Sequence, residues 1–204
     1  MDIIRKQTVK RSDPEKHPGG TPLAKAPRID LGTEIISKER YTSVEFMQLE
    51  WDKIWTKTWL LGCREDQIPE PGDFICTNIG TESVILVRQK NNEIKAFHNV
   101  CMHRGNRLAD EGLWHAESFV CGYHGWEYGS DGTFVDIPDL DTFQQGKPPC
   151  SGLAELPCDT WVSFVWFSLN TEVEPLEEYI GDLVGHFEPY HFERMAMTRW
   201  VTAE

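Results

Sequence analysis

Two short segments of this 204-residue chain each place one cysteine and one histidine close together. The first segment, CMHRG, contains Cys101 and His103, and the second, CGYHGW, contains Cys121 and His124. Thiolates and imidazoles are protein ligands of zinc and of mixed-ligand iron–sulfur clusters. The chain must fold so that both segments meet at one point if they hold a single metal centre. They therefore constrain the fold more than any other feature of the sequence.

The order of the ligands favours one kind of metal centre. Zinc fingers usually pair cysteine with cysteine and histidine with histidine along the chain, whereas here each segment supplies one of each. That order suits a two-iron cluster, in which each segment gives its cysteine to one iron and its histidine to the other. Nearby glycines allow backbone N–H groups to approach the sulfur atoms. A zinc site and a coincidence of unrelated residues remain the alternatives.

The sequence around the two segments predicts a small, mostly β domain. Short apolar runs alternate with turn residues, as in a meander of antiparallel strands: WLLGC, FICTNI, SVILVRQ, IKAFHNV, ESFVC and GTFVDI. The run WVSFVWFSL at 161–169 is predicted as one buried strand that closes this meander. We therefore expect a small antiparallel sandwich or barrel.

Helices are predicted on both sides of the β region. Residues 43–55 have apolar side chains near helical spacing, and Ser43 suits the N-cap position. Residues 175–190 are predicted as one helix with a single apolar stripe, which begins at Pro175 and ends at Pro189. These patterns divide the chain into four expected parts: a flexible basic arm over 1–32, a helical lead-in over 33–60, the β domain over 61–172, and a helix that opens a truncated further domain over 173–204.

Composition and charge exclude several classes of partner. The formal net charge of −13 disfavours nucleic acid, which needs a basic face. No apolar run is long enough to span a bilayer, and the N-terminus lacks the apolar segment of a secretory signal. We therefore expect a cytoplasmic protein that binds neither nucleic acid nor membrane.

Six cysteines without a secretory signal do not indicate a disulfide framework. Cys63 and Cys76 lie in apolar runs and are expected to be small buried residues. Cys150 and Cys158 indicate nothing by their spacing. The two remaining cysteines are those of the paired segments.

The segments CMHRG and CGYHGWEYGSDG resemble the Rieske motif of ring-hydroxylating oxygenase α subunits, and EPGDF and WFSL resemble that family's β framework. The resemblance covers residues 35–204 and implies a Rieske fold with one [2Fe–2S] cluster. It implies four cluster ligands, namely Cys101, His103, Cys121 and His124. It also implies a supporting set, in which the tryptophan shields one side of the cluster: Arg104, Gly105, Gly122, Tyr123, Gly125 and Trp126.

Two departures separate this chain from the Rieske proteins of cytochrome complexes. Those proteins have one more cysteine in each loop, and the two pair as a disulfide; Asn106 and Tyr123 occupy the matching positions here. Their serine after HG is replaced by Trp126. The disulfide and the serine each stabilise the reduced cluster in those proteins. Because this chain lacks both, we expect a potential near the low end of the Rieske range, about −150 mV. Such a potential suits electrons from a reductase or ferredoxin rather than from a quinol.

The resemblance further implies the electron-transfer portion of an oxygenase used in aromatic hydrocarbon catabolism. Electrons would pass from a reductase or ferredoxin to a mononuclear iron for O2-dependent hydroxylation, and His124 would meet an acidic residue of a neighbouring subunit. The complete enzyme would be a trimer-type homo-oligomer, with or without a β subunit. The alternatives are a stand-alone Rieske ferredoxin-like carrier and a zinc-stabilised binding module.

The mononuclear iron site itself is expected outside this chain, so the isolated chain should not oxygenate a substrate. The segment HFEPYH offers His186, Glu188 and His191 as substitute ligands. Positions i and i+2 of a helix do not share a face, and Pro189 interrupts the helix before the second histidine. We therefore reject this segment as an iron site.

Overall fold

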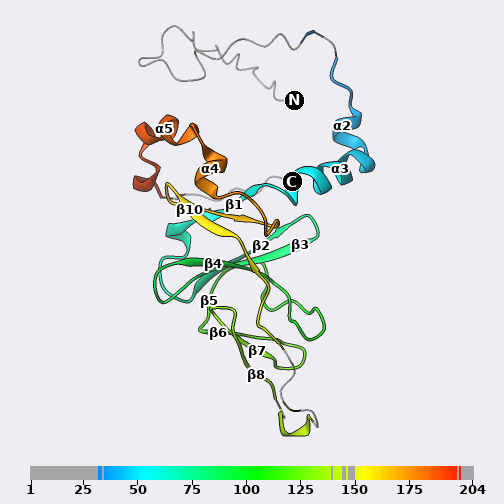
Figure 1. Cartoon of the computed structure of the whole chain (residues 1–204), viewed down its shortest axis with the longest axis vertical. Coiled ribbons are helices and arrows are strands. Elements are labelled where there is room, and N and C mark those ends of the chain that lie inside the picture. Colours follow the sequence, from blue (N-terminus) through cyan, green and yellow to red (C-terminus); the bar gives the residue numbers. More distant parts are fainter. Residues whose placement is uncertain are drawn as a thin grey trace, which may run out of the picture.

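The structure, a computed structural model, describes residues 32–33, 35–138, 140–143, 146, 150–196 and 198. Almost all of the predicted basic arm lies outside the described residues, and the four predicted segment boundaries stay predictions. The α-helices lie at one end of the body, and the sheets extend from them towards the other end (Figure 1). The expected mostly β fold with flanking helices is confirmed.

Three antiparallel sheets form the body. The first has the order β1 (Trp59–Arg64), β11 (Phe164–Ser168), β10 (Cys158–Trp161). The second has the order β5 (Gly112–His115), β2 (Asp73–Ile79), β3 (Glu82–Arg88), β4 (Ile94–His98), β9 (Glu155–Leu156). The third has the order β6 (Ser118–Val120), β7 (Glu127–Gly129), β8 (Phe134–Asp136). The first sheet lies beside the helices and the third lies towards the opposite end (Figure 1).

Strand β3 is buried on both faces and separates two apolar cores. Ile85 and Val87 face the core that also contains the cysteines of the paired segments. Val84 and Leu86 face the other core, which packs against the first sheet. All four side chains have no exposed surface. The alternation of side chains along a strand thus sends successive residues of β3 to opposite cores.

The N-terminal helical segment begins where the sequence predicts it. The Ser43 hydroxyl accepts a hydrogen bond from the Phe46 N–H at 3.1 Å, which confirms Ser43 as the N-cap of α3 (Val44–Glu50). The helix then continues as a π-helical turn, η2 (Trp51–Trp55). The other short helices of the described chain are α2 (Glu39–Thr42), η3 (Glu65–Gln67), η4 (Leu140–Thr142), α4 (Leu176–Ile180), α5 (Leu183–Phe187), η5 (Glu188–Tyr190) and η6 (Phe192–Arg194).

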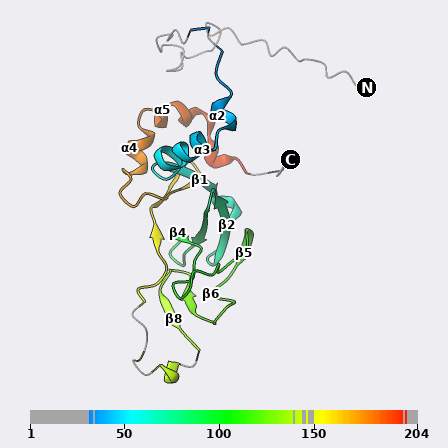
Figure 2. The same ribbon diagram turned by 90° about the vertical axis from the view of Figure 1, so that its right-hand side faces the viewer.

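The helices α3, α4 and α5 lie at one end of the body, and the short helix η4 lies at the other. Figure 2 shows η4 at the end away from α3, α4 and α5. Among the described helices, none has the length and apolar character needed to cross a membrane.

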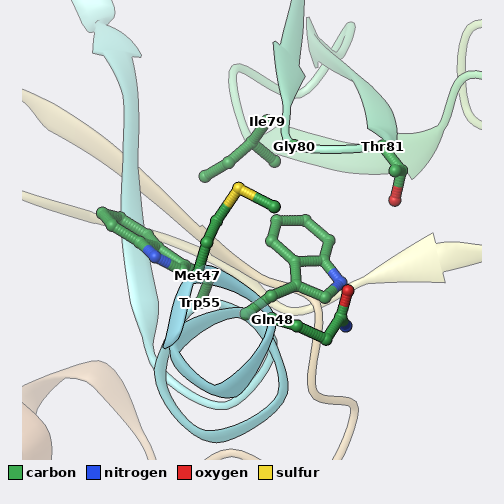
Figure 3. A pocket seen from close by; sticks show the side chains of 7 residues that line it. Met47, Gln48, Trp55, Ile79, Gly80 and Thr81 are labelled. Atoms are coloured by element: carbon green, nitrogen blue, oxygen red, sulfur yellow. The ribbon is translucent and has the colours of Figure 1, made fainter. Parts of the chain in front are cut away.

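A hollow of about 420 Å³ lies where the N-terminal helical segment meets the turn between β2 and β3 (Figure 3). Its lining is mostly apolar: Met47, Gln48, Trp51, Trp55, Ile79, Gly80 and Thr81. A Cβ atom at Gly80 would lie 2.3 Å from the Trp51 ring, so only glycine allows this close approach. The N-terminal helical segment therefore packs on the β2–β3 turn through the Trp51 ring, which lies against the backbone of Gly80.

The apolar run at 161–169 is not one strand, and that prediction is wrong. It contains the hairpin turn between β10 and β11, in which Trp161 pairs with Phe164. The two turn residues, Val162 and Ser163, have φ of 46° and 66°. A two-residue hairpin turn with two positive φ angles is usually marked by Asn or Gly, and this chain has neither there.

The prediction of a single helix at 175–190 is also wrong, because the helix is interrupted at Gly181. This glycine has φ of 52°, which ends α4 before α5 begins. Leu176 and Ile180 of α4 are buried against Trp59, as the apolar stripe predicts. Leu183 of α5 is 52% exposed, so the second half of the stripe does not continue into the core.

Asp73 closes the turn that precedes β2. Its carboxylate accepts the Glu70 N–H at 2.9 Å and lies 2.8 Å from Nδ1 of His115 on β5. These two contacts, the backbone hydrogen bond first, lower the pKa of Asp73 below its usual value. A lowered folded-state pKa stabilises the fold above the unfolded-state pKa, and this contribution is lost as the pH falls.

We expect Asp73→Ala to reduce the free energy of unfolding by about 1 kcal/mol at pH 7. The loss should shrink at about pH 3, which lies below the ordinary aspartate pKa of about 3.9, because there the carboxyl of the unfolded chain binds a proton. Urea unfolding of both proteins at the two pH values measures the difference. Equal losses at both pH values would show that the charge of Asp73 does not contribute.

Candidate metal centre

The first paired segment forms a tight turn after β4. The Cys101 N–H donates to the Asn106 carbonyl at 2.7 Å, and the Gly105 N–H donates to the Cys101 carbonyl at 2.9 Å. Gly105 has φ of +74°, which favours glycine. We call residues 101–106 the first turn.

The second paired segment repeats this backbone pattern between β6 and β7. The Cys121 N–H donates to the Trp126 carbonyl at 2.8 Å, and the Gly125 N–H donates to the Cys121 carbonyl at 2.9 Å. Gly125 has φ of +70°. The second turn, residues 121–126, therefore has the same hydrogen bonds at the same offsets from its cysteine as the first turn.

The structure brings the four predicted ligands together as two pairs. Cys101 and Cys121 are each 2% exposed, lie in the same apolar core, and each affects the pKa of the other. The rings of His103 and His124 have centroids 4.6 Å apart. The thiols lie in the apolar core, whereas His103 is half-buried and His124 is exposed.

A buried nitrogen atom tests whether these residues fit a metal. Nδ1 of His103 is buried and has no hydrogen-bond partner in the structure. Burial, followed by the charges of His124 and Arg104, lowers the pKa of His103, which favours the neutral imidazole that metals bind. A buried polar atom without a partner is rare in folded proteins, and a metal ligand bond would satisfy it. The residues present therefore fit a metal centre.

The arrangement suits two metal ions better than one. Tetrahedral zinc needs all four ligands around one ion. A [2Fe–2S] cluster with mixed ligands needs two thiolates at one iron and two imidazoles at the other. The two separate pairs therefore favour the cluster.

Each histidine of the pair has an aromatic neighbour. The Trp126 ring is stacked on His103, with centroids 4.7 Å apart and an interplanar angle of 3°. Tyr123 packs on His124 with centroids 3.7 Å apart. The stacked Trp126 ring therefore covers one face of His103 and is itself only 7% exposed, whereas Tyr123 is 61% exposed.

The other residues of the predicted supporting set lie at the rims of the turns. Arg104 and Gly122 are exposed, and Arg104 acts on His103 through its charge. A Cβ atom at Gly122 would meet nothing within 4 Å. At Gly125 it would lie 2.6 Å from Cγ of Pro138, so this glycine is required by contact as well as by its backbone angle.

Sequence reasoning missed Tyr128 on β7. Its side chain is completely buried, its hydroxyl oxygen lies 3.4 Å from the Cys101 sulfur, and it accepts the Met102 N–H at 3.1 Å. Burial, followed by the contact with Cys101, raises the pKa of Tyr128, so the hydroxyl keeps its proton. The proton can be donated to the Cys101 sulfur. Its only signal in the sequence is its place two residues after HGW.

Asn106 also contacts a ligand, although the sequence shows it only as a missing cysteine. Its side-chain amide lies 3.8 Å from the sulfur of Cys121 in the opposite turn. Burial by itself would raise the pKa of Cys121, but the backbone N–H groups of Tyr123 and His124, the Cys101 side chain and this amide together lower it. The first turn therefore supports a ligand of the second turn.

A family model described as the Rieske [2Fe-2S] domain matches residues 58–157, which include both turns and most of the three sheets. Residues 58–157 are a Rieske [2Fe-2S] domain. This finding agrees with the separation of the thiols and imidazoles into two pairs.

Relatives of the Rieske domain are large components of oxygenase systems. The large oxygenase component of the 2,4-dinitrotoluene dioxygenase system of Burkholderia sp. (strain RASC) is 36% identical over 152 residues, which are 73% of this chain and 34% of that protein. The corresponding component of the naphthalene 1,2-dioxygenase system of Pseudomonas putida is 35% identical over 148 residues, which are 71% of this chain and 33% of that protein. The chain thus spans about a third of the length of these curated relatives.

A solved structure shows the same fold around the Rieske domain. The naphthalene 1,2-dioxygenase from Rhodococcus sp., bound to indole, has a TM-score of 0.70 and 26% sequence identity to this chain. The match covers 75% of this chain and 36% of the other. The similarity extends beyond the Rieske domain itself into the flanking segments.

We expect Tyr128→Phe to make the reduction potential of the Rieske cluster more negative. A hydrogen bond to a cluster sulfur stabilises the more negative, reduced state. If that preference is about 1.4 kcal/mol, the shift is about 60 mV for one electron. Protein-film voltammetry of both proteins measures the shift. An unchanged potential in a correctly folded variant would show that the hydroxyl does not donate to Cys101.

Proposed function

We propose that this chain is the electron-transfer portion of an aromatic-ring-hydroxylating-type oxygenase α subunit. In this proposal Cys101 and Cys121 ligate one iron of a [2Fe–2S] cluster, and His103 and His124 ligate the other. The observation that carries the ligand set is the pairing of two buried thiols and two adjacent imidazoles on turns with the same pattern of backbone hydrogen bonds. The bound cluster supplies one-electron transfer.

The two histidines have different tasks in this proposal. His103 is covered by Trp126, which holds the imidazole plane fixed. His124 is exposed, so its free ring nitrogen is open to a partner. A ligand imidazole donates its second N–H to an acceptor. His124 is therefore the proposed contact with an acidic residue of a neighbouring subunit.

The relatives support the proposed partners and the proposed reaction. These are large components of oxygenase systems named for aromatic compounds, naphthalene and 2,4-dinitrotoluene. The proposed electron donor is a reductase, a ferredoxin or both. The proposed acceptor is a mononuclear iron at which O2-dependent hydroxylation of an aromatic substrate takes place. The proposed complete enzyme is a cytoplasmic homo-oligomer of trimer type, with or without a β subunit.

The alternative is a stand-alone Rieske ferredoxin-like carrier. The length of the similarity argues against it, because the matched 152 residues exceed the 58–157 domain. The flanking helices also pack on that domain, where Leu176 and Ile180 of α4 are buried against Trp59 of β1. An independent carrier would not need these additions.

Anaerobic reconstitution of the chain with iron and sulfide tests the cluster. We expect a brown protein with two irons per chain and, after reduction, an EPR signal with a low average g value. A colourless protein that binds one zinc per chain would overturn the proposal. Reduction by NADH through an oxygenase-system reductase then tests the donor, and a cluster that this donor cannot reduce would contradict the proposed electron path.

A further inference from the structure

The two turns have the same internal hydrogen bonds but different support. The second turn lies inside the β6–β7 hairpin, where Val120 pairs with Glu127 directly beside it. The first turn follows the end of β4, and residues 99–111 belong to no strand. No strand pairing therefore closes the base of the first turn, although it carries half of the proposed ligands.

The side chain of Asn99 takes the place of that missing pairing. Its Oδ1 accepts the N–H groups of Leu108 and Ala109 at 3.0 and 3.1 Å. Its Nδ2 donates to the Ala109 carbonyl at 2.7 Å. The carboxamide thus both accepts from and donates to Ala109, as a peptide group does in a strand pair. One planar side chain therefore joins the start of the loop to its end.

Asn99 is also anchored to the central sheet. It is 3% exposed, and its backbone N–H donates to the Ser83 carbonyl at 2.8 Å. Its Nδ2 further lies 3.0 Å from the Ser83 hydroxyl and 3.0 Å from the Cys76 sulfur. These contacts fix the base of the first turn against β2 and β3. Every polar atom of the Asn99 side chain has a partner.

We propose that Asn99 is a positioning residue for the metal centre. By closing the loop between residues 99 and 109, it holds Cys101 and His103 at the separation from the second turn that the cluster requires. A metal site needs its ligands held within a fraction of an ångström, and an open loop does not provide this. The inference rests on the ligand set given under the proposed function.

The chemistry of the site requires asparagine. Aspartate has the same shape and keeps the two acceptor contacts, but it cannot donate to Ala109 and it brings a buried negative charge. Serine is shorter and offers one hydroxyl in place of the planar amide. Asn99→Asp and Asn99→Ser therefore remove the pairing with Ala109 in two different ways.

The test compares the reconstituted full chain with its Asn99→Asp and Asn99→Ser variants. We expect EDTA to bleach the visible absorption of the cluster about tenfold or more faster in both variants. In the metal-free proteins, we expect the amides of Leu108 and Ala109 to exchange their hydrogens faster, while Gly125 in the second turn keeps its protection.

Arg88→Met is the matched control for a general loss of stability. Arg88 is buried at the other end of β3, where it donates to the carbonyls of Ile68, Asn92 and Glu65. Urea is added so that each Asn99 variant and Arg88→Met are compared at the same free energy of unfolding. Bleaching of the Asn99 variants no faster than that of Arg88→Met under these conditions would overturn the inference, as would failure of both Asn99 variants to fold.

The two proposals fail in different ways. A parent protein that takes up no iron would contradict the proposed function, and the hydrogen-exchange comparison would still show whether Asn99 holds the first turn. A parent protein with a normal cluster and Asn99 variants that bleach at the parental rate would contradict only the positioning role.

Discussion

Replacement of Cys101 by serine, or of His124 by alanine, is expected to abolish the visible absorption and the EPR signal of the reconstituted protein. Each substitution removes one of the two protein ligands that the proposal assigns to an iron. Metal binding also stabilises the folded turns, so loss of a ligand should loosen the turn that carried it. This is the first turn for Cys101 and the second turn for His124. Iron content, absorption and EPR of the purified variants measure the effect. Full retention of the spectrum in either variant would refute that ligand.

Matched substitutions elsewhere in the chain separate this effect from damage to the fold. Cys63→Ser changes a thiol that lies in the core on the other face of the central sheet. Burial raises the pKa of Cys63 to about 12, so its thiol stays neutral. His115→Ala removes an exposed imidazole that contacts Asp73. Both controls are expected to keep two irons per chain.

Gly125→Ala is expected to destabilise the protein far more than Gly105→Ala, although the two glycines occupy equivalent places in the turns. Their φ angles, +70° and +74°, impose a similar cost of about 1–2 kcal/mol on any other residue. A Cβ atom at Gly125 would also lie 2.6 Å from Pro138, whereas at Gly105 the nearest atom is 4.0 Å away in Val100. The collision adds about 1–3 kcal/mol at Gly125.

Urea unfolding of the metal-free variants gives both free energies, and iron content after reconstitution shows which turn still assembles the centre. We expect Gly105→Ala to fold and bind iron, and Gly125→Ala to unfold at clearly lower urea concentration. Equal losses in the two variants would show that Pro138 moves aside without cost. Gly105→Ala is thus the control for Gly125→Ala, because it introduces the same backbone cost without the contact with Pro138.

The features of the metal centre that depend on local spacing could be predicted from the sequence. Each turn is formed by six consecutive residues, so the positions of Cys101 and Cys121 follow from the nearby glycines. The β framework was predictable too, because β2 to β4 alternate or concentrate apolar residues between clear turn signals. These signals act over a few residues and need no knowledge of the whole fold.

The features that were missed depend on contacts between distant segments. The turn at Val162 and Ser163 contains no glycine or asparagine that would mark it in the sequence. The pairing of β10 and β11 holds these two residues at positive φ, which they do not prefer. Tyr128 and Asn99 look like ordinary core residues until the fold sets them beside Cys101 and Ala109. Gly181 is one glycine in a helical pattern, and only the packing of α4 shows that the chain turns there.

Strand β3 has a consequence for how this domain can change through insertions and deletions. Its residues alternate between the core that holds the turns and the core beside the helices. Loss of one residue within β3 would shift the rest of the strand by one position and exchange the two sets of side chains. Single substitutions there alter only one side of this shared wall. The length of β3 is therefore under a stricter constraint than the identity of any one of its apolar residues.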